Sequence, residues 1–370
     1  MKRQSKGSMR WHRRFRRYFR ERLYRSGAQL YLSDWWPRRF SIRAFGLTRF
    51  SDKKRHGARF YSTPLNWLLG PALSSRRPTA LLIPEPFGRL GNQTIQLVHA
   101  IAISKRLRVS RILAPHNSLL PAGITTLPSG GEVDTAPETV SSVRLRDLWA
   151  RKGNWTLQDS QLVMNTYFSR ELEQKLSPAE YDGAFSELRA VAPLGAGDRP
   201  LPASHLVIHL RGGDAFGPQA HPDYAQPPLA FYRLILASRR WRQVTIVRAD
   251  ASHPFEELLL SEIREAGVKV HVQSASAEED ARFLARARSL VSSRGSFVPA
   301  IVGRSTHCSE LFVFGDEDRL RAGLAVHRIV DEKGDYWRSC CQRNWQDSAT
   351  QRQLMRDYPA ENCRWETENR

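Results

Sequence analysis

An arginine follows an apolar stretch near the middle of the chain, in the sequence His209-Leu-Arg-Gly-Gly-Asp214. The preceding letters, LVIH, are typical of a buried strand. An Arg at a strand end can grip a phosphate through two parallel N–H bonds, and glycines let the backbone approach a ligand closely. We therefore interpret Arg211, Gly213 and Asp214 as an anion-binding loop, with a surface turn held by an Arg–Asp pair as the alternative. A zinc site at His209 is excluded, because no second ligand lies at helical or strand spacing.

A glycine-rich turn of similar character precedes it in the chain, with the sequence FGRLGNQ over residues 87–93. Gly91 allows close backbone approach, and Asn92 lies where a helix is expected to begin, near its unpaired N–H groups and positive dipole end. The alternative is that Asn92 only caps the helix. The pattern predicts either a ligand-facing amide or a helix cap at this position.

Two further loops carry polar groups directly after apolar strands. Asp250 follows VTIVRA and could accept hydrogen bonds from a base or a ribose, or serve as a turn or N-cap residue. The segment 292–298 presents Ser293, Ser296 and Phe297 at the entry to a helix, which favours an anion pocket. The alternative for that segment is an ordinary capped helix start.

These loops need a scaffold of alternating strands and helices, and the sequence supplies one. Strands are expected at residues 80–83, 111–113, 206–210, 244–250, 268–272 and 290–293. Helices are expected at residues 94–107, within 168–200, and at 228–240, 254–266 and 278–289, whereas 121–140 has the composition of a loop. The pattern predicts the α/β class, with two Rossmann-like domains facing across a cleft. Ligands of such sheets bind at the carboxyl ends of strands, which selects the loops 84–92, 211–217, 248–253 and 292–298.

The charge of the chain is uneven. The 370 residues have a formal net charge of +20, which by itself would suggest nucleic acid or an anionic membrane as a partner. Residues 1–80 hold 21 Lys and Arg against 3 Asp and Glu, whereas the other 290 residues hold 36 against 34. The body is therefore nearly neutral, and the basic excess belongs to an N-terminal extension over residues 1–78.

Arginines and aromatic residues interleave in the first part of this extension, MKRQSKGSMRWHRRFRRYFRERL. Residues 1–60 could rest on an anionic membrane surface, clamp RNA, or form a solvated basic tail. We expect the membrane surface and do not expect nucleic acid. No apolar run is long enough to span a bilayer or to serve as a signal peptide. The sequence thus predicts a cytoplasmic protein, peripheral at the inner membrane, with four reduced and structural cysteines.

The loops together resemble a known family. FGRLGNQTIQLVHAIAISKRL is similar to the GRxGNQ signature of bacterial α-1,2-fucosyltransferases and related protein O-fucosyltransferases. HLRGGD resembles the HxRRxD or HxRxG motif of that superfamily, and EEDARFLARARSLVSSRGSF resembles its acidic helix and Ser-Phe loop. These matches occur in the family's order over about residues 80–305. Two departures stand out: Gly212 replaces the second motif arginine, and Val298-Pro299 replaces a Trp pair in a loop one residue longer.

The resemblance implies a GT-B-like glycosyltransferase that moves fucose from GDP-fucose onto a glycan or lipid-linked saccharide of a cell-surface polysaccharide. Domain 79–200 would be the acceptor side, and domain 201–370 would bind the nucleotide-sugar donor. No metal or other cofactor is implied. Arg211 would contact the diphosphate, and Asn92 would face the reacting centre. The remaining donor-binding residues would be His209, Gly91, Gly213, Asp214, Asp250, Ser293, Ser296 and Phe297.

The resemblance agrees with the physics of glycosyl transfer. Negative charge grows on the departing diphosphate, so a preorganised arginine and helix N-termini stabilise the transition state more than the ground state. No DxD-type acidic pair lies in a suitable loop, which fits a metal-independent enzyme. Two alternatives stay open: a nucleic-acid-binding protein that uses its basic arm, and a non-catalytic relative that binds sugar nucleotides.

Overall fold

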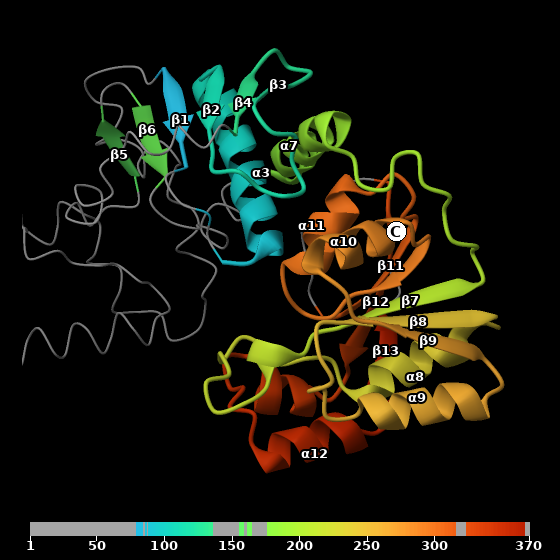
Figure 1. Cartoon of the computed structure of the whole chain (residues 1–370). Helices are drawn as coiled ribbons and strands as arrows, with labels where there is room; N and C mark the ends of the chain where they lie inside the picture. Colours follow the sequence, from blue (N-terminus) through green and yellow to red (C-terminus); the bar gives the residue numbers. More distant parts are fainter. Residues whose placement is uncertain are drawn as a thin grey trace, which may run out of the picture.

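The computed structural model describes residues 79–83, 86, 88–135, 155–158, 161–164, 176–315 and 323–366. These residues form two β-sheets with helices packed against them (Figure 1). The basic extension, residues 1–78, lies outside the described residues, so the membrane arm stays a prediction. None of the described helices is long and apolar enough to cross a membrane.

The first sheet has six strands in the order β3-β4-β2-β1-β6-β5. β4, β2, β1 and β6 run parallel, and β3 and β5 pair antiparallel at the two edges. The strands are Ala80–Leu82 (β1), Arg111–Leu113 (β2), Ile124–Thr126 (β3), Glu132–Asp134 (β4), Trp155–Gln158 (β5) and Gln161–Met164 (β6). Its helices are α3 (Leu90–Leu107) and α7 (Pro178–Val191). The chain first adds strands on one side of β1 and later on the other, so the strand order reverses between β1 and β6.

The second sheet has seven strands in the order β13-β12-β11-β10-β7-β8-β9. All pairs are parallel except β12 with β13. The strands are His205–Leu210 (β7), Gln243–Arg248 (β8), Lys269–Gln273 (β9), Ser289–Val291 (β10), Glu310–Phe314 (β11), Ala325–Asp331 (β12) and Cys363–Glu366 (β13). The helices are α8 (Leu229–Ser238), α9 (Glu256–Glu265), α10 (Ala277–Ala285), α11 (Phe297–Arg304) and α12 (Ala349–Asp357). The six parallel strands have the 3-2-1-4-5-6 order of a Rossmann fold, which reverses between β7 and β10.

The central strand β7 is buried at all six positions, which explains its mostly apolar sequence, HLVIHL. Leu206, Ile208 and Leu210 belong to the core formed with α8 and α9, whereas Val207 belongs to the core formed with α10 and α11. Both faces of the strand are therefore buried, as is usual in a parallel sheet with helices on both sides. The α/β class with two Rossmann-like sheets is confirmed.

The two halves meet through helices. α3 and α7 pack against α11 between the sheets (Figure 1). Arg304 at the end of α11 is 1% exposed and donates to the carbonyls of Ala192 and Leu119 in the first half. Burial lowers the pKa of Arg304 to about 10, so the guanidinium stays charged near neutral pH. Arg304 therefore joins the two halves through hydrogen bonds. The domain boundary at residue 200, which the sequence predicts, stays a prediction.

Some expected elements differ from the observed ones. α3 begins at Leu90, four residues before the expected start, so Gly91 and Asn92 lie inside the helix and not in the turn that precedes it. The expected loop 121–140 contains the short strands β3 and β4, and residues 136–140 lie outside the described residues. Six residues of β3 and β4 give too little periodicity to distinguish a strand from a turn.

Candidate functional site

Arg211 follows β7 directly, at the reversal point of the second sheet. Its Nε and Nη2 donate to the Asp214 carboxylate at 3.3–3.4 Å, and its Nη1 donates to the Arg294 carbonyl at 3.4 Å. The Tyr224 ring lies beneath it, with the guanidinium carbon 3.7 Å from the ring centroid. These hydrogen bonds are longer than the usual 2.7–3.2 Å, so a better acceptor could replace them. The arginine is thus held in place without being tightly bound.

Arg89 brings a second guanidinium to the same carboxylate. It lies in the turn before α3, in the first half, and its Nη2 is 3.4 Å from Asp214. The Arg89 side chain is 72% exposed, whereas that of Arg211 is 19% exposed. Asp214 therefore lies between a sheltered cation of its own half and an exposed cation of the other. Sequence reasoning did not assign Arg89, although its place inside the GRxGNQ-like motif was a usable signal.

The loop that carries Arg211 is anchored from β8. The Gly213 N–H donates to Asp250 Oδ1 at 3.1 Å and to Ser252 Oγ at 2.8 Å, and the Ser252 N–H donates to Asp250 Oδ1 at 2.9 Å. Burial alone would raise the pKa of Asp250, but hydrogen bonds from Ser252 and Gly213 outweigh it and lower that pKa. In this geometry Asp250 serves the turn, which was the alternative to a base or ribose contact.

The glycine at position 212 has a structural reason. A β-carbon there would lie 2.9 Å from Ser252 Oγ and 3.0 Å from Asp250 Cγ, closer than ordinary contacts allow. The second arginine of the family motif therefore has no space at this position. Gly295 is constrained similarly, because its φ is +142° and a β-carbon would lie 2.6 Å from Arg211 Nη1.

His209 is a neutral positioning group in this site. It is 9% exposed, its Nδ1 is hydrogen-bonded to Ser293 Oγ, and its ring centroid lies 5.3 Å from that of Phe297. Burial, reinforced by the charge of Arg211, lowers the pKa of His209 to about 3. At neutral pH the imidazole therefore adds no charge next to Arg211.

The first turn of α3 meets the start of α11. Ser296 Oγ donates to Asn92 Oδ1, and a β-carbon on Gly91 would lie 2.7 Å from Phe297 Cα. The N-cap of α3 is Arg89, without a side-chain cap bond, so the interpretation of Asn92 as the helix cap is wrong. α11 also has no side-chain cap bond at its N-terminus; its N-cap residue is Ser296, whose Oγ donates to Asn92. The first-turn N–H groups of α11 therefore lack the side-chain acceptor that a capped helix has.

The structure thus brings the predicted site residues together. Arg211, Gly213 and Asp214 follow β7, and Asp250 follows β8. His209 links the end of β7 to Ser293, after β10. Gly91 and Asn92 reach the same place from α3. Tyr224 and Ser252 were missed, and their positions carry no recognisable sequence signal.

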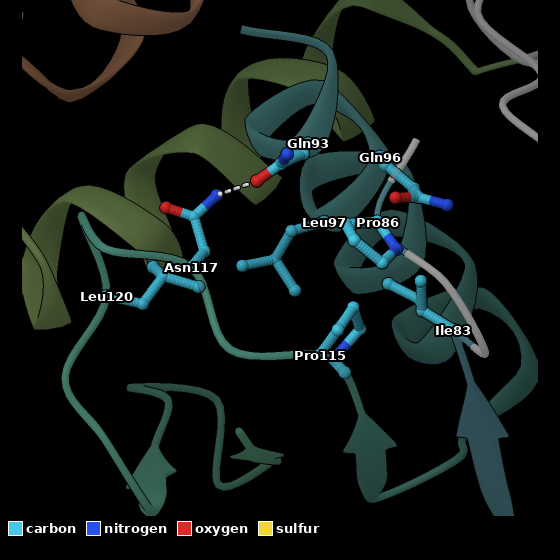
Figure 2. Close-up of a pocket in the computed structure, with 9 residues that line it drawn as sticks. Ile83, Pro86, Gln93, Gln96, Leu97, Pro115, Asn117 and Leu120 are labelled. Atoms are coloured by element: carbon cyan, nitrogen blue, oxygen red, sulfur yellow. Dashed lines mark hydrogen bonds between the residues drawn. The ribbon is translucent and has the colours of Figure 1, made fainter. Parts of the chain in front are cut away.

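A separate, shallow pocket lies at the carboxyl ends of β1 and β2, beside α3 (Figure 2). Asn117 Nδ2 donates to Gln93 Oε1 at 3.1 Å on one side of it. The cavity itself measures about 20 Å³, and its empty space counted together with open solvent is about 260 Å³. Its lining residues are Ile83, Pro86, Gln93, Gln96, Leu97, Ala114, Pro115, Asn117 and Leu120. Among the described residues no group of three or more His, Cys, Asp or Glu could hold a metal ion.

No protein-family model matches the chain, and no curated protein matches it. Among solved structures, the chain is similar to the heptosyltransferase WaaC of E. coli, solved with ADP. The two are 12% identical, the match covers 67% of this chain and 90% of that one, and the TM-score is 0.32. This similarity is too low to carry an argument about function.

Proposed function

We propose that this protein is a glycosyltransferase that takes its sugar from a nucleotide diphosphate donor. In its most specific form, the proposal is transfer of fucose from GDP-fucose to a glycan or lipid-linked saccharide of a cell-surface polysaccharide. The carrying observation is the position of Arg211 at the reversal point of a Rossmann-like sheet, where ligands of such sheets bind. The motif resemblance supports the choice of fucose.

The reaction breaks the bond between the anomeric carbon and the diphosphate oxygen, and forms a bond from that carbon to the oxygen of an acceptor hydroxyl. The hydroxyl proton passes to the departing diphosphate or to a carboxylate. The electron pair of the broken bond leaves on the diphosphate, so charge builds up there. Arg211 donates to Asp214 with N–H groups that a phosphate can accept bidentately. An arginine fixed beforehand in a sheltered site stabilises this charge at little reorganisation cost.

Two further groups support an anion at this place. Arg89 adds a cation from the first half, on the open side of Asp214. The first turn of α11 adds backbone N–H groups without a side-chain cap, together with the positive end of the helix dipole. With these groups the enzyme needs no metal to balance the leaving charge, so we expect EDTA to leave transfer unchanged.

The direct test is a titration of the full chain with GDP, UDP and ADP, followed by transfer from the matching sugar nucleotides. We expect GDP to bind at least tenfold more tightly than UDP or ADP. Preference for another base would overturn the fucose assignment while keeping the transferase. A chain that binds a sugar nucleotide without turnover would be the non-catalytic relative, and a chain that binds none would contradict the proposal.

The localisation proposal has its own test. We expect the full chain to sediment with vesicles of anionic phospholipid and not with neutral vesicles, and we expect deletion of residues 1–60 to abolish this. Donor binding should survive the deletion. Steeply salt-dependent binding to RNA, lost with the same deletion, would instead favour the nucleic-acid alternative.

A further inference from the structure

We propose that Trp345 and Asp347 are positioning residues of the anion site, which hold the loop beneath Arg211 and thereby set the affinity of that site for a diphosphate. The inference deepens the proposed function and rests on it in one respect, the identification of the anion as the diphosphate of the donor. The two residues lie far from Arg211 in the sequence, in the segment that leads into α12. Figure 1 shows this segment, in red, beside the yellow-green loop that follows β7, and hydrogen bonds join the two.

The loop that they hold runs over residues 216–228, between a short 3-10 turn (Gly213–Ala215) and α8. Its sequence, FGPQAHPDYAQPP, has four prolines, which lack the N–H that regular elements use. The backbone hydrogen bonds inside it close short turns only. Irregular loops of this length are uncommon in compact domains and are often functional. Here the loop carries Tyr224, the ring that lies under the Arg211 guanidinium.

Trp345 fixes the first part of this loop. Its Nε1–H donates to the Ala215 carbonyl at 2.6 Å, and its backbone N–H donates to the Pro222 carbonyl at 3.3 Å. The indole is fully buried and lies edge-on to the Phe216 ring, with the two centroids 5.9 Å apart. One residue therefore holds both the end of the anion loop and the middle of the loop that carries Tyr224.

Asp347 holds the same loop through its carboxylate. Its Oδ2 accepts from the Gly217 N–H, and Arg352 of α12 donates to both of its carboxylate oxygens, at 2.6 and 2.7 Å. The Asp347 side chain is 3% exposed, and the bidentate arginine offsets the cost of burying its charge. Asp347 also has a φ of +55°, in the left-handed region that is unfavourable for a residue with a β-carbon. The carboxylate is therefore fixed by its surroundings, and its hydrogen bond fixes Gly217.

The other end of the loop is tied to the anion site itself. Gln226 Nε2 donates to the Tyr224 carbonyl at 2.8 Å and to the Arg294 carbonyl at 3.4 Å. The same Arg294 carbonyl accepts from Arg211. Tyr336, also in the C-terminal part of the chain, donates to the Gln226 carbonyl at 2.6 Å. With both ends held, the Tyr224 ring has a defined place, and Arg211 lies on it.

The two positioning residues act on Arg211 through the loop. Within the described part of the chain, no hydrogen bond or ion pair joins Trp345 or Asp347 to Arg211, whose own hydrogen bonds are 3.3–3.4 Å long. Such long bonds hold a guanidinium weakly, so the ring beneath it matters for its position. A cation that is already in place binds an anion at a lower cost. Releasing the loop should therefore weaken diphosphate binding without removing any group that contacts the anion.

The test is isothermal titration of the full chain with GDP and with inorganic pyrophosphate. We expect Trp345→Phe, which keeps an aromatic ring but removes the N–H donor, to raise both dissociation constants about fivefold, the usual worth of one hydrogen bond. Asp347→Asn weakens both the Arg352 pair and the bond from Gly217, and it should raise them about tenfold. If Asp347→Asn does not fold, Trp345→Phe decides.

A second background separates positioning from general damage to the fold. Because Trp345 and Asp347 act through Arg211, adding either substitution to Arg211→Ala should change the affinity for GDP less than twofold. A loss by the same factor in the wild-type and the Arg211→Ala backgrounds would overturn the inference.

The matched controls are Trp241→Phe and Asp335→Asn. Trp241 is another buried indole of the second half, and its Nε1–H donates to the Ile235 carbonyl at 3.0 Å, just before β8. Asp335 pairs with Arg338 and is 57% exposed. Both controls should leave the affinity for pyrophosphate within twofold, and thermal unfolding of every variant verifies that it folds. An equal loss of affinity in Trp241→Phe would overturn the inference.

The outcomes distinguish this inference from the proposed function. Pyrophosphate binding that depends on Trp345 and Asp347, without any sugar transfer, would keep the positioning role and overturn the transferase. Sugar transfer with an affinity that both substitutions leave unchanged would do the reverse. A wild-type chain that binds pyrophosphate but not GDP would overturn the choice of base, and the pyrophosphate titrations would then decide the inference. Binding of neither probe would overturn both.

Discussion

Each sheet reverses its strand order beside its first strand, and the two reversal points present different chemistry. Beyond β7 and β10 the structure places Arg211, Asp214 and a buried imidazole. Beyond β1 and β2 it places amides over an apolar base. The shared topology sets where a ligand can bind, and the side chains set which ligand.

The largest effect is expected from removing Arg211, the largely buried cation at the reversal point of the second sheet. We expect Arg211→Ala to lower kcat/KM by roughly 10²–10³, the usual cost of losing one preorganised group that stabilises developing charge. The kcat/KM of Arg211→Lys should lie between those of the wild type and Arg211→Ala, because an ammonium keeps the charge without the bidentate geometry of a guanidinium. Steady-state kinetics with the preferred donor measures both.

The control for Arg211 is Arg338→Ala, which removes a 63%-exposed arginine paired with Asp335 elsewhere in the second half. It should leave kcat/KM within twofold. If Arg211→Ala also stayed within a few-fold of wild type, the anion site would be wrongly placed.

Acid should destabilise the second half, because burial lowers the pKa of its histidines His209 and His253. His253 is 5% exposed between Phe216 and Phe255, and burial lowers its pKa to about 3, with Asp250 opposing the shift and His209 adding to it. The unfolded chain, with a pKa near 6.5, then takes up the proton first. Stability present above pH 6.5 is lost as the pH falls toward 3, about 3 kcal/mol by pH 4 at 1.36 kcal/mol per unit.

Urea unfolding at pH 7, 5.5 and 4 measures this loss. His253→Leu should reduce the slope of this pH dependence, because an apolar side chain has no proton to gain, while His209, whose pKa is also lowered to about 3, keeps its own contribution. His116→Leu is the control at an exposed position and should keep the wild-type slope. A His253→Leu slope parallel to wild type would contradict the assignment.

The contact that joins the two sites can be broken by one methyl group. A β-carbon at Gly91 would lie 2.7 and 2.8 Å from the Phe297 backbone, so Gly91→Ala must push α3 away from α11. We expect a loss of about 2 kcal/mol of stability and a fall in kcat. Gly183→Ala is the matched control, because it lies in helix α7 with nothing within 4 Å and should gain about 0.5–1 kcal/mol. Equal effects of the two variants on thermal unfolding would refute the close approach.

From β7 to β10 the sequence predicted each strand and helix, because the alternation of short apolar runs with helical patterns shows there, whereas β11, β12, α12 and β13 were not predicted. β7 and β8 begin one residue before their expected starts, and α8 begins one residue after. The residues of the anion site were predicted from their place after strands. Asn92 was predicted less well, because the start of α3 is fixed by its packing on α11 and by no local cap. Tyr224 was missed because its contact with Arg211 depends on the fold, whereas Arg89 stands inside the GRxGNQ-like motif and could have been assigned from it.

Substitution of the exposed Arg89 should have the smallest effect, and it distinguishes an anion site shared by the two halves from one formed by the second half alone. Arg89 is 72% exposed, so water and salt screen its effect on Asp214 and on any bound anion. We expect Arg89→Ala to raise the donor KM about three- to fivefold at low salt, and we expect the difference to shrink near 0.5 M salt. Arg106→Ala is the control, because Arg106 ends the same helix and pairs with Glu180, 3.4 Å away. A loss as large as that of Arg211→Ala would show that both cations act in the transition state. No change at any salt concentration would show that the anion site belongs to the second half alone.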